Sequence, residues 1–117
     1  MLVARTSFAN VAASQTDSNI ISAKESTIFR VIGGFVVVAG TATNLTFNSK
    51  GTGAGTAITS IIPCGINGGL LMPSTAQIPS GESPCGYFDT NKGEGLTVTT
   101  GAGASIVGVT MRYVEIS

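Results

Sequence analysis

Residues 94–116 read EGLTVTTGAGASIVGVTMRYVEI, and both halves of this stretch alternate apolar with polar residues. Successive side chains of a strand point to opposite faces, so this alternation is typical of strands that bury one face. It predicts strands over 94–100 and 105–116, joined by a tight hairpin connection at 101–104. The side chains expected to face the core are Leu96, Val98, Val107, Val109, Met111 and Tyr113.

The preceding part of the chain also divides into short apolar segments, separated by clusters of Gly, Pro, Asn and Ser. The longest segment, 27–39, is interrupted by Gly33 and Gly34 in the way that a bulge or bend would interrupt it. Its second half, 35–38, is uniformly apolar, which predicts a strand buried on both faces. Shorter strands are expected over 19–23, 44–49, 57–62, 70–72 and 86–89.

About eight strands, separated by turn residues and without an amphipathic helical stripe, predict an all-β fold. The best fit is an antiparallel two-sheet β-sandwich of jelly-roll type. An immunoglobulin-like sandwich is the second choice, because the chain has no Trp to occupy the core of that fold. We expect residues 19–117 to form this single domain. Residues 1–18 show no period and are predicted to form an N-terminal arm, extended or poorly ordered.

Only 10% of the residues are charged, against about 25% in an average protein, while 43% are hydrophobic. Six basic and six acidic side chains cancel, so no net charge draws the chain to nucleic acid or to an anionic membrane. The first residues show no secretory signal, and the longest apolar run, 31–39, is about half of a membrane-spanning helix. We therefore expect no nucleic-acid partner and no membrane partner, and the weakly charged surface favours docking to other proteins.

The chain has no His, which removes Ser-His-Asp and Cys-His catalysis together with the commonest transition-metal ligand. Zinc would need Cys64 and Cys85 plus carboxylates, without CxxC spacing. Asp89, Asn91 and Glu94 flank one turn and offer oxygens to Ca²⁺, but their spacing matches no calcium-binding signature and also fits a solvated hairpin end. We expect no enzymatic activity, no metal and no cofactor.

Two other motifs have structural interpretations. The run 51–55 (Gly-Thr-Gly-Ala-Gly) lacks the GK[ST] ending of a phosphate-binding loop, because Lys50 precedes the glycines, and it predicts a flexible connection. Cys64 and Cys85 permit one disulfide bridge, but in a chain without an export signal free thiols are favoured.

Several short motifs follow one another in a fixed order from residue 28 to the C-terminus. They are Ile28-Phe-Arg-Val-Ile32, Asn44-Leu-Thr-Phe47, Asn67-Gly-Gly-Leu70, Gly86-Tyr-Phe-Asp-Thr90, Gly93-Glu-Gly-Leu96 and Gly108-Val-Thr-Met-Arg-Tyr-Val-Glu115. In this order they resemble a group of small virion proteins of tailed bacteriophages. The chain departs from that group in having Tyr87 where Trp is expected, and in a longer loop over 74–84.

The resemblance implies a capsid cement or decoration subunit: a homotrimer on the outside of the phage head that binds the major capsid protein and bridges neighbouring capsomers. It also implies a virion protein that is assembled in the host cytoplasm. The expected contact surfaces are the arm and the loops 50–56 and 74–86, with Leu2, Val3, Phe8, Val11, Lys50 and Tyr87 as contact residues. Two alternatives are a structural piece of a tail or head fibre and a carbohydrate-binding jelly-roll module, for which Tyr87 and Phe88 would supply the sugar platform.

Overall fold

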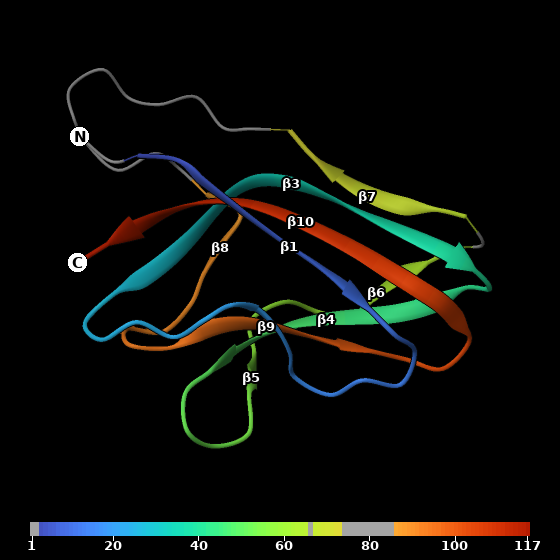
Figure 1. Ribbon diagram of the computed structural model, residues 1–117, viewed down its shortest axis with the longest axis horizontal. Coiled ribbons are helices and arrows are strands. Elements are labelled where there is room, and N and C mark those ends of the chain that lie inside the picture. Colours follow the sequence, from blue (N-terminus) through green and yellow to red (C-terminus); the bar gives the residue numbers. More distant parts are fainter. Residues whose placement is uncertain (1–2, 66, 74–85) are drawn as a thin grey trace.

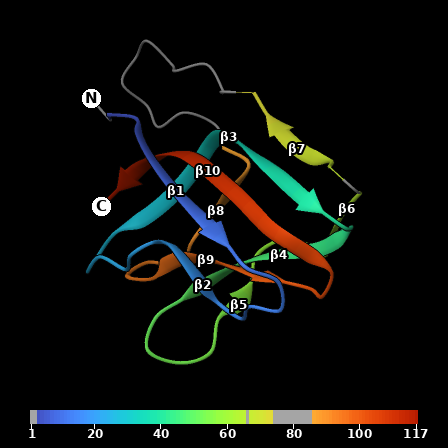
Figure 2. The same cartoon turned by 45° about the vertical axis from the view of Figure 1, so that its right-hand side comes forward.

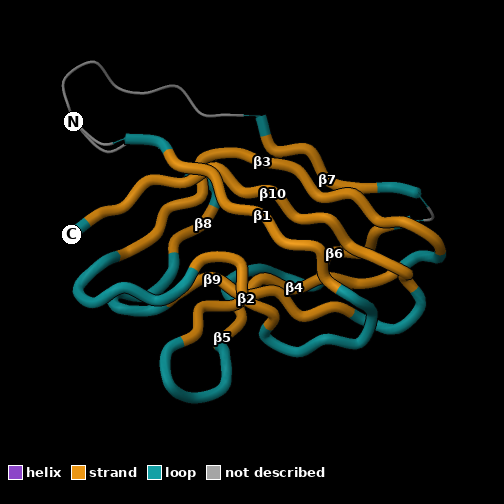
Figure 3. The backbone as a smooth tube through the Cα atoms, viewed as in Figure 1, coloured by secondary structure: helices purple, strands orange, loops and turns teal. Residues whose placement is uncertain are grey.

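The computed structural model describes residues 3–65, 67–73 and 86–117, and this part of the chain contains strands and no helix (Figure 3). The strands are β1 (Arg5–Val11), β2 (Ser18–Ile21), β3 (Ile28–Gly40), β4 (Thr43–Lys50), β5 (Thr56–Ala57), β6 (Ile62–Cys64), β7 (Gly69–Met72), β8 (Phe88–Asp89), β9 (Gly95–Thr100) and β10 (Ala104–Ile116).

The strands form two antiparallel five-stranded sheets that lie one over the other (Figures 1 and 2). In the first sheet the order is β1-β10-β3-β7, and β8 also pairs with β3. In the second sheet the order is β2-β9-β4-β5, and β6 also pairs with β4. The predicted all-β, two-sheet sandwich is therefore confirmed.

The pairing of the strands is nested along the sequence. The first strand pairs with the last (β1 with β10), β2 pairs with β9, β3 with β7 and β8, and β4 with β5 and β6. The chain is thus one long hairpin whose tip is the glycine-rich loop 51–55, rolled so that successive pairs fall in alternate sheets. This is the topology of a jelly roll rather than that of an immunoglobulin domain.

The connection 101–104 is not a hairpin, and this prediction was wrong. β9 pairs with β2 and β4 in the second sheet, whereas β10 pairs with β1 and β3 in the first sheet. Because both edges of β9 are already occupied, the chain must cross from one sheet to the other at this end of the sandwich. The alternation of apolar residues identified both strands but carries no information on which strand pairs with which.

The predicted N-terminal arm is largely part of the sandwich. Residues 5–11 are extended, but they form edge strand β1, which pairs with β10 along its whole length. Val11 is buried in the core, and the Ser7 hydroxyl donates a 2.6 Å hydrogen bond to the Ile20 carbonyl of the second sheet. The sandwich therefore begins at Arg5 rather than at residue 19.

The core fills the space between the two sheets with aliphatic and aromatic side chains. Phe47 of β4 stacks on Phe88 of β8 with ring centroids 5.4 Å apart, which joins the two sheets directly. Phe29 meets Tyr113 edge to face at 5.5 Å within the first sheet. All six core positions predicted on β9 and β10 belong to this cluster or pack against it: Leu96, Val98, Val107, Val109, Met111 and Tyr113.

Two of the predicted strands are irregular: one contains a bulge and the other is divided in two. In β3 the register to β10 shifts so that Ile32 has no partner, and this bulge adjoins the predicted interruption at Gly33 and Gly34. The strand expected over 57–62 is split into β5 and β6. Between them the Thr59 hydroxyl accepts a 3.1 Å hydrogen bond from the Phe47 amide, so a side chain takes the place of a backbone carbonyl and interrupts the ladder.

Gly34 is the position of β3 that tolerates no side chain. Its φ is 134°, and an added Cβ would collide with the Thr110 carbonyl oxygen of β10. Gly34→Ala should therefore lower the free energy of unfolding by about 2–4 kcal/mol, through backbone strain and overpacking. Gly53→Ala is the matched control, because a Cβ at Gly53 meets nothing within 4 Å and should change stability by less than about 0.5 kcal/mol. Urea unfolding followed by circular dichroism measures both, and equal midpoints for the two variants would contradict the close approach at Gly34.

Candidate functional site

The outer face of the first sheet carries a row of four side chains across four strands, of which three are large and apolar and one is a Thr. Phe8 of β1 lies opposite Thr110 of β10, Thr110 opposite Phe35 of β3, and Phe35 opposite Leu71 of β7. Residues directly opposite one another share a face of the sheet, so these four side chains stand side by side. Phe8 and Leu71 are each 74% exposed and Phe35 is 47% exposed.

The next row along the strands extends the same patch. Val37 is 52% exposed and lies between Gly108 and Gly69, while Ile106 at the end of the face is 51% exposed. We call this surface the apolar face and define it by five residues: Phe8, Phe35, Val37, Leu71 and Ile106.

The apolar face corrects the prediction that 35–38 is buried on both sides. Val36 and Val38 are buried against the second sheet, whereas Phe35 and Val37 point outward and are half exposed. Nothing in the described part of the chain covers them. A uniformly apolar strand predicts that both of its faces are covered, and here Phe35 and Val37 are exposed on one of them.

The size of the apolar face matches the largest apolar patches found on typical monomers. Five side chains that are 47–74% exposed present roughly 500 Å² if each carries about 150–200 Å² of surface. The largest apolar patch of a typical monomer is about 300–600 Å² and often marks an interaction site. The face therefore lies in the upper part of this range, on a chain of only 117 residues.

The outer face of the second sheet is polar and is covered by the chain itself. The connection 12–17 between β1 and β2 lies against β9, where the Asp17 carboxylate accepts a 3.0 Å hydrogen bond from the Thr97 hydroxyl. The same carboxylate accepts a 2.9 Å bond from the Gly55 amide, and the Asp17 amide donates to the Thr99 hydroxyl at 3.2 Å. The two outer faces thus differ in kind: this one is polar and hydrogen-bonded within the chain, whereas the other exposes the large apolar side chains of the apolar face.

Charged groups lie at the margins of the apolar face. Arg112 is exposed on the outward side of β10, beside Thr6 and two residues from Thr110. Beyond the bulge in β3, Arg30 holds the Asp89 carboxylate with two nitrogen–oxygen contacts of 2.8 and 2.9 Å. Among the described residues between the Arg30–Asp89 pair and Ile106, Arg112 is the one charged side chain on this face.

The predicted contact residues differ in their location and exposure. Phe8 belongs to the apolar face, and Val3 is 65% exposed just before β1. Val11 is 2% exposed in the core, so it is not a surface contact; its side chain falls on the inward side of β1. Lys50 is half-buried at the end of β4, in the other sheet. Leu2 lies outside the described residues.

Tyr87, the predicted sugar platform, is 46% exposed. Its hydroxyl donates a 2.6 Å hydrogen bond to the Pro73 carbonyl, and its amide bonds to the Val31 carbonyl, so the residue is fixed beside β3. Phe88, its proposed partner, instead stacks on Phe47 between the sheets. The two rings therefore do not form a shared exposed platform.

Prediction from the sequence did not identify Phe35, Val37, Leu71 and Ile106 as members of an exposed apolar face. Their strands had been identified, but periodicity does not say which side of a sheet is covered. The available signal was the pair of neighbouring apolar positions in 35–38, together with the absence of charge from 31–39. Such a run fits a two-sided core and an exposed interface equally well.

The carboxylates considered for calcium are engaged with protein groups. Asp89 is held by Arg30, whereas Glu94 accepts hydrogen bonds from the Ser49 hydroxyl at 2.7 Å and from the Asn91 side-chain amide at 3.1 Å. Within the described ranges no three His, Cys, Asp or Glu side chains gather as a metal site. The arrangement is that of a braced turn.

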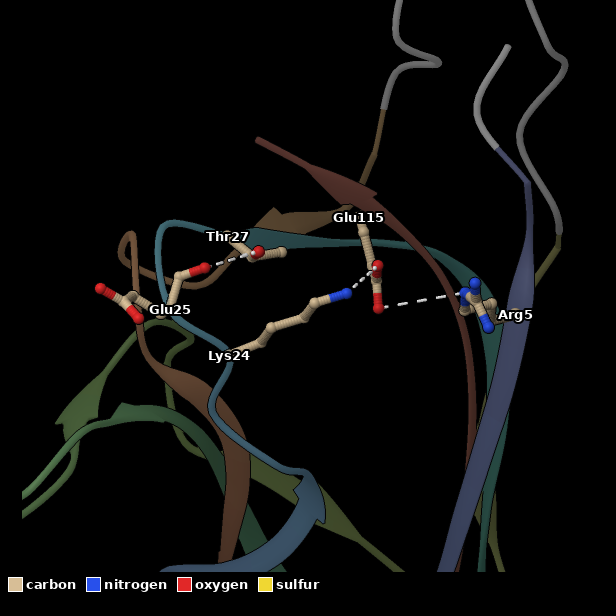
Figure 4. Close-up of polar contacts among 5 residues, drawn as sticks. All are labelled: Arg5, Lys24, Glu25, Thr27 and Glu115. Atoms are coloured by element: carbon tan, nitrogen blue, oxygen red, sulfur yellow. Dashed lines mark hydrogen bonds and ion pairs between the residues drawn. The ribbon is translucent and has the colours of Figure 1, made fainter.

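A further set of charges ties strand ends together (Figure 4). Glu115 of β10 lies 3.0 Å from the Lys24 ammonium and 3.9 Å from the Arg5 guanidinium, which approach it from opposite sides. Arg5 belongs to β1, and Lys24 to the connection between β2 and β3. These partly exposed pairs contribute little stability. Lys24 and Glu115 also line a hollow of about 520 Å³, together with Ser7, Phe29 and Tyr113.

Comparisons with known proteins are sparse. No protein-family model and no curated protein matches the sequence. Among solved structures, the chain is similar to the virus-like particle of the extra small virus of the giant freshwater prawn Macrobrachium rosenbergii, determined by cryo-electron microscopy. That likeness has a TM-score of 0.33 and 14% sequence identity, and it covers 99% of this chain and 80% of the other. At such a TM-score it carries no argument about function. No helix in the described part of the chain is long and apolar enough to cross a membrane.

Cys64 is a free thiol buried in β6, and Cys85 lies outside the described residues. Burial raises the pKa of the Cys64 thiol, because the thiolate would lose its hydration. In a Cys85→Ser variant, Cys64 should therefore react with iodoacetamide much more slowly in the native protein than in urea. Labelling followed by mass spectrometry measures both rates, and equal rates would show that the site is open to solvent.

Proposed function

We propose that this chain is a structural subunit of a virus particle, specifically a cement or decoration subunit on the outside of a tailed-phage head. The observation that carries the proposal is the apolar face: a jelly roll presents roughly 500 Å² of apolar surface, and patches of this size often mark sites of contact with other proteins. Jelly rolls recur in capsid and lectin domains, which fits this use of the fold. The resemblance from residue 28 onward supports the more specific cement role.

The proposed mechanism is mechanical rather than chemical. A subunit that binds the assembled shell but not its separated parts stabilises the shell by mass action. Its partners would be the major capsid protein and other copies of the chain, as trimers that bridge neighbouring capsomers. Assembly would take place in the host cytoplasm. Such a role requires surfaces of contact and no reactive group.

The loop 51–55 and the apolar face lie on different sides of the domain and can bind different partners. The loop 51–55 is the tip of the rolled hairpin and projects on the side away from the apolar face (Figure 1). The Gly55 amide is anchored to Asp17, so the base of this loop is fixed while Thr52, Gly53 and Ala54 stay exposed. We propose that this loop, with Lys50 beside it, contacts the shell.

A carbohydrate-binding role is the alternative, and a glycan array separates the two functions. A cement subunit should bind no glycan on the array. Strong, saturable binding that Tyr87→Ala abolishes would favour the sugar-binding module instead. Tyr87 is the residue to test because it is exposed and was predicted as part of the sugar platform.

Shell binding is tested by cosedimentation with empty shells, built from the major shell protein of the virus that encodes this chain. The wild-type chain should bind saturably, and Ala54→Arg should weaken binding about tenfold or more, since a large cation would stand in the contact. Ala23→Arg introduces the same side chain at an exposed position outside the loop and should bind as the wild type does. A wild-type chain that stays in the supernatant at saturating shell would contradict the proposed function.

A further inference from the structure

We infer that the apolar face is the surface through which copies of this chain contact one another. The inference deepens the proposed function and rests on its claim that the apolar face is a protein interface. Whether two copies meet face to face or three turn these faces toward a common axis, the same side chains come together. The occupant of the face is a second copy, rather than the shell.

The shape of the face is complementary to itself. Phe35 and Leu71 stand as a ridge between two hollows, one of about 390 Å³ over Gly34 and one of about 440 Å³ over Gly69. Hollows of about 300 Å³ or more accept groups larger than a single aromatic ring. Ridge and hollows therefore lie side by side on one surface, so the ridge of one copy can enter a hollow of another.

The absence of charge favours a like partner. When copies use the same patch, a patch that carries charge of one sign faces the same sign on the other copy and is repelled by it. Here Arg112 stands at the margin, and the Arg30–Asp89 pair neutralises itself beyond the bulge. Recognition of a different protein usually draws on complementary charges across the interface, and the apolar face offers almost none of them.

The amount of apolar surface also fits a stable contact between copies. A standard interface buries about 800 Å² on each partner, of which about 56–65% is apolar, or roughly 450–520 Å². The five side chains of the apolar face present roughly 500 Å². The polar residues around them, Thr6, Asn10 and Thr110, supply the remainder of such a surface.

Self-association is measured on the purified full chain by size-exclusion chromatography with light scattering over a range of concentrations. The wild type should have a mass of two or three times the 11.7 kDa subunit. Leu71→Glu should raise the dissociation constant between copies about tenfold or more, because it places a charge on the ridge. Ile61→Glu is the matched control: Ile61 is 66% exposed, close to the 74% of Leu71, but adjoins β6 in the other sheet.

Circular dichroism establishes that both variants fold, and Val37→Thr supplies a milder change of nearly the same shape on the same face. Val37→Thr should weaken association by less than Leu71→Glu does. A wild-type chain that remains monomeric at every concentration would overturn the inference, as would equal association by Leu71→Glu and Ile61→Glu.

Shell binding separates this inference from the proposed function. A monomeric wild-type chain that binds shells would refute the inference and leave the cement role standing. An oligomer that Leu71→Glu dissociates but that never binds shells would support the inference and refute the cement role.

Discussion

The pairing of β3 with β10 is the contact on which the rest of the structure depends. Both strands are 13 residues long, and they pair from Ile28 with Ile116 at one end to Gly40 with Ala104 at the other. Every other strand of the first sheet attaches to one of these two. Closing so long a stretch of chain costs conformational entropy, which the burial of both inner faces must offset. β8 also pairs with β3, and its Phe88 stacks on Phe47 of the second sheet, so the contact between the layers attaches to the same strand.

Nested pairing also explains why the two outer faces differ. The connection 12–17 leaves β1 at one edge of the first sheet and enters β2 in the second, so it passes over the outside of β9 and satisfies its threonines through Asp17. No connection in the described part of the chain makes the same passage over β10 and β3. On that side Phe35 and Val37 of β3 are apolar and about half exposed. Exposed apolar surfaces of this kind often mark sites of protein–protein contact.

The proposed function is binding, which requires no catalytic group. The charged side chains named below instead form ion pairs and hydrogen bonds that hold turns and strand ends in place. Arg30 forms an ion pair with Asp89 beside β3, and Glu94 links the turn before β9 to Ser49 by a hydrogen bond. Glu115 forms ion pairs with Lys24 and Arg5, which belong to two other segments. Each carboxylate thus has partners that fix a turn or a strand end. The geometry favours a rigid block with one apolar side and an exposed loop on the other.

The sequence by itself determined the fold class, most strand positions and the inward-facing residues, because alternation along a strand is a local property. Leu96, Val98, Val107 and Met111 were identified as core on that basis and are fully buried. The tertiary structure alone decided which strands pair, since nothing local in 101–104 distinguishes a hairpin from a crossing between sheets. It also decided that β1 completes the sandwich and that the outward side of 35–38 is uncovered. The pairing of β1 and the exposure of 35–38 both depend on which segments pack against the first sheet, and those segments are distant in the sequence.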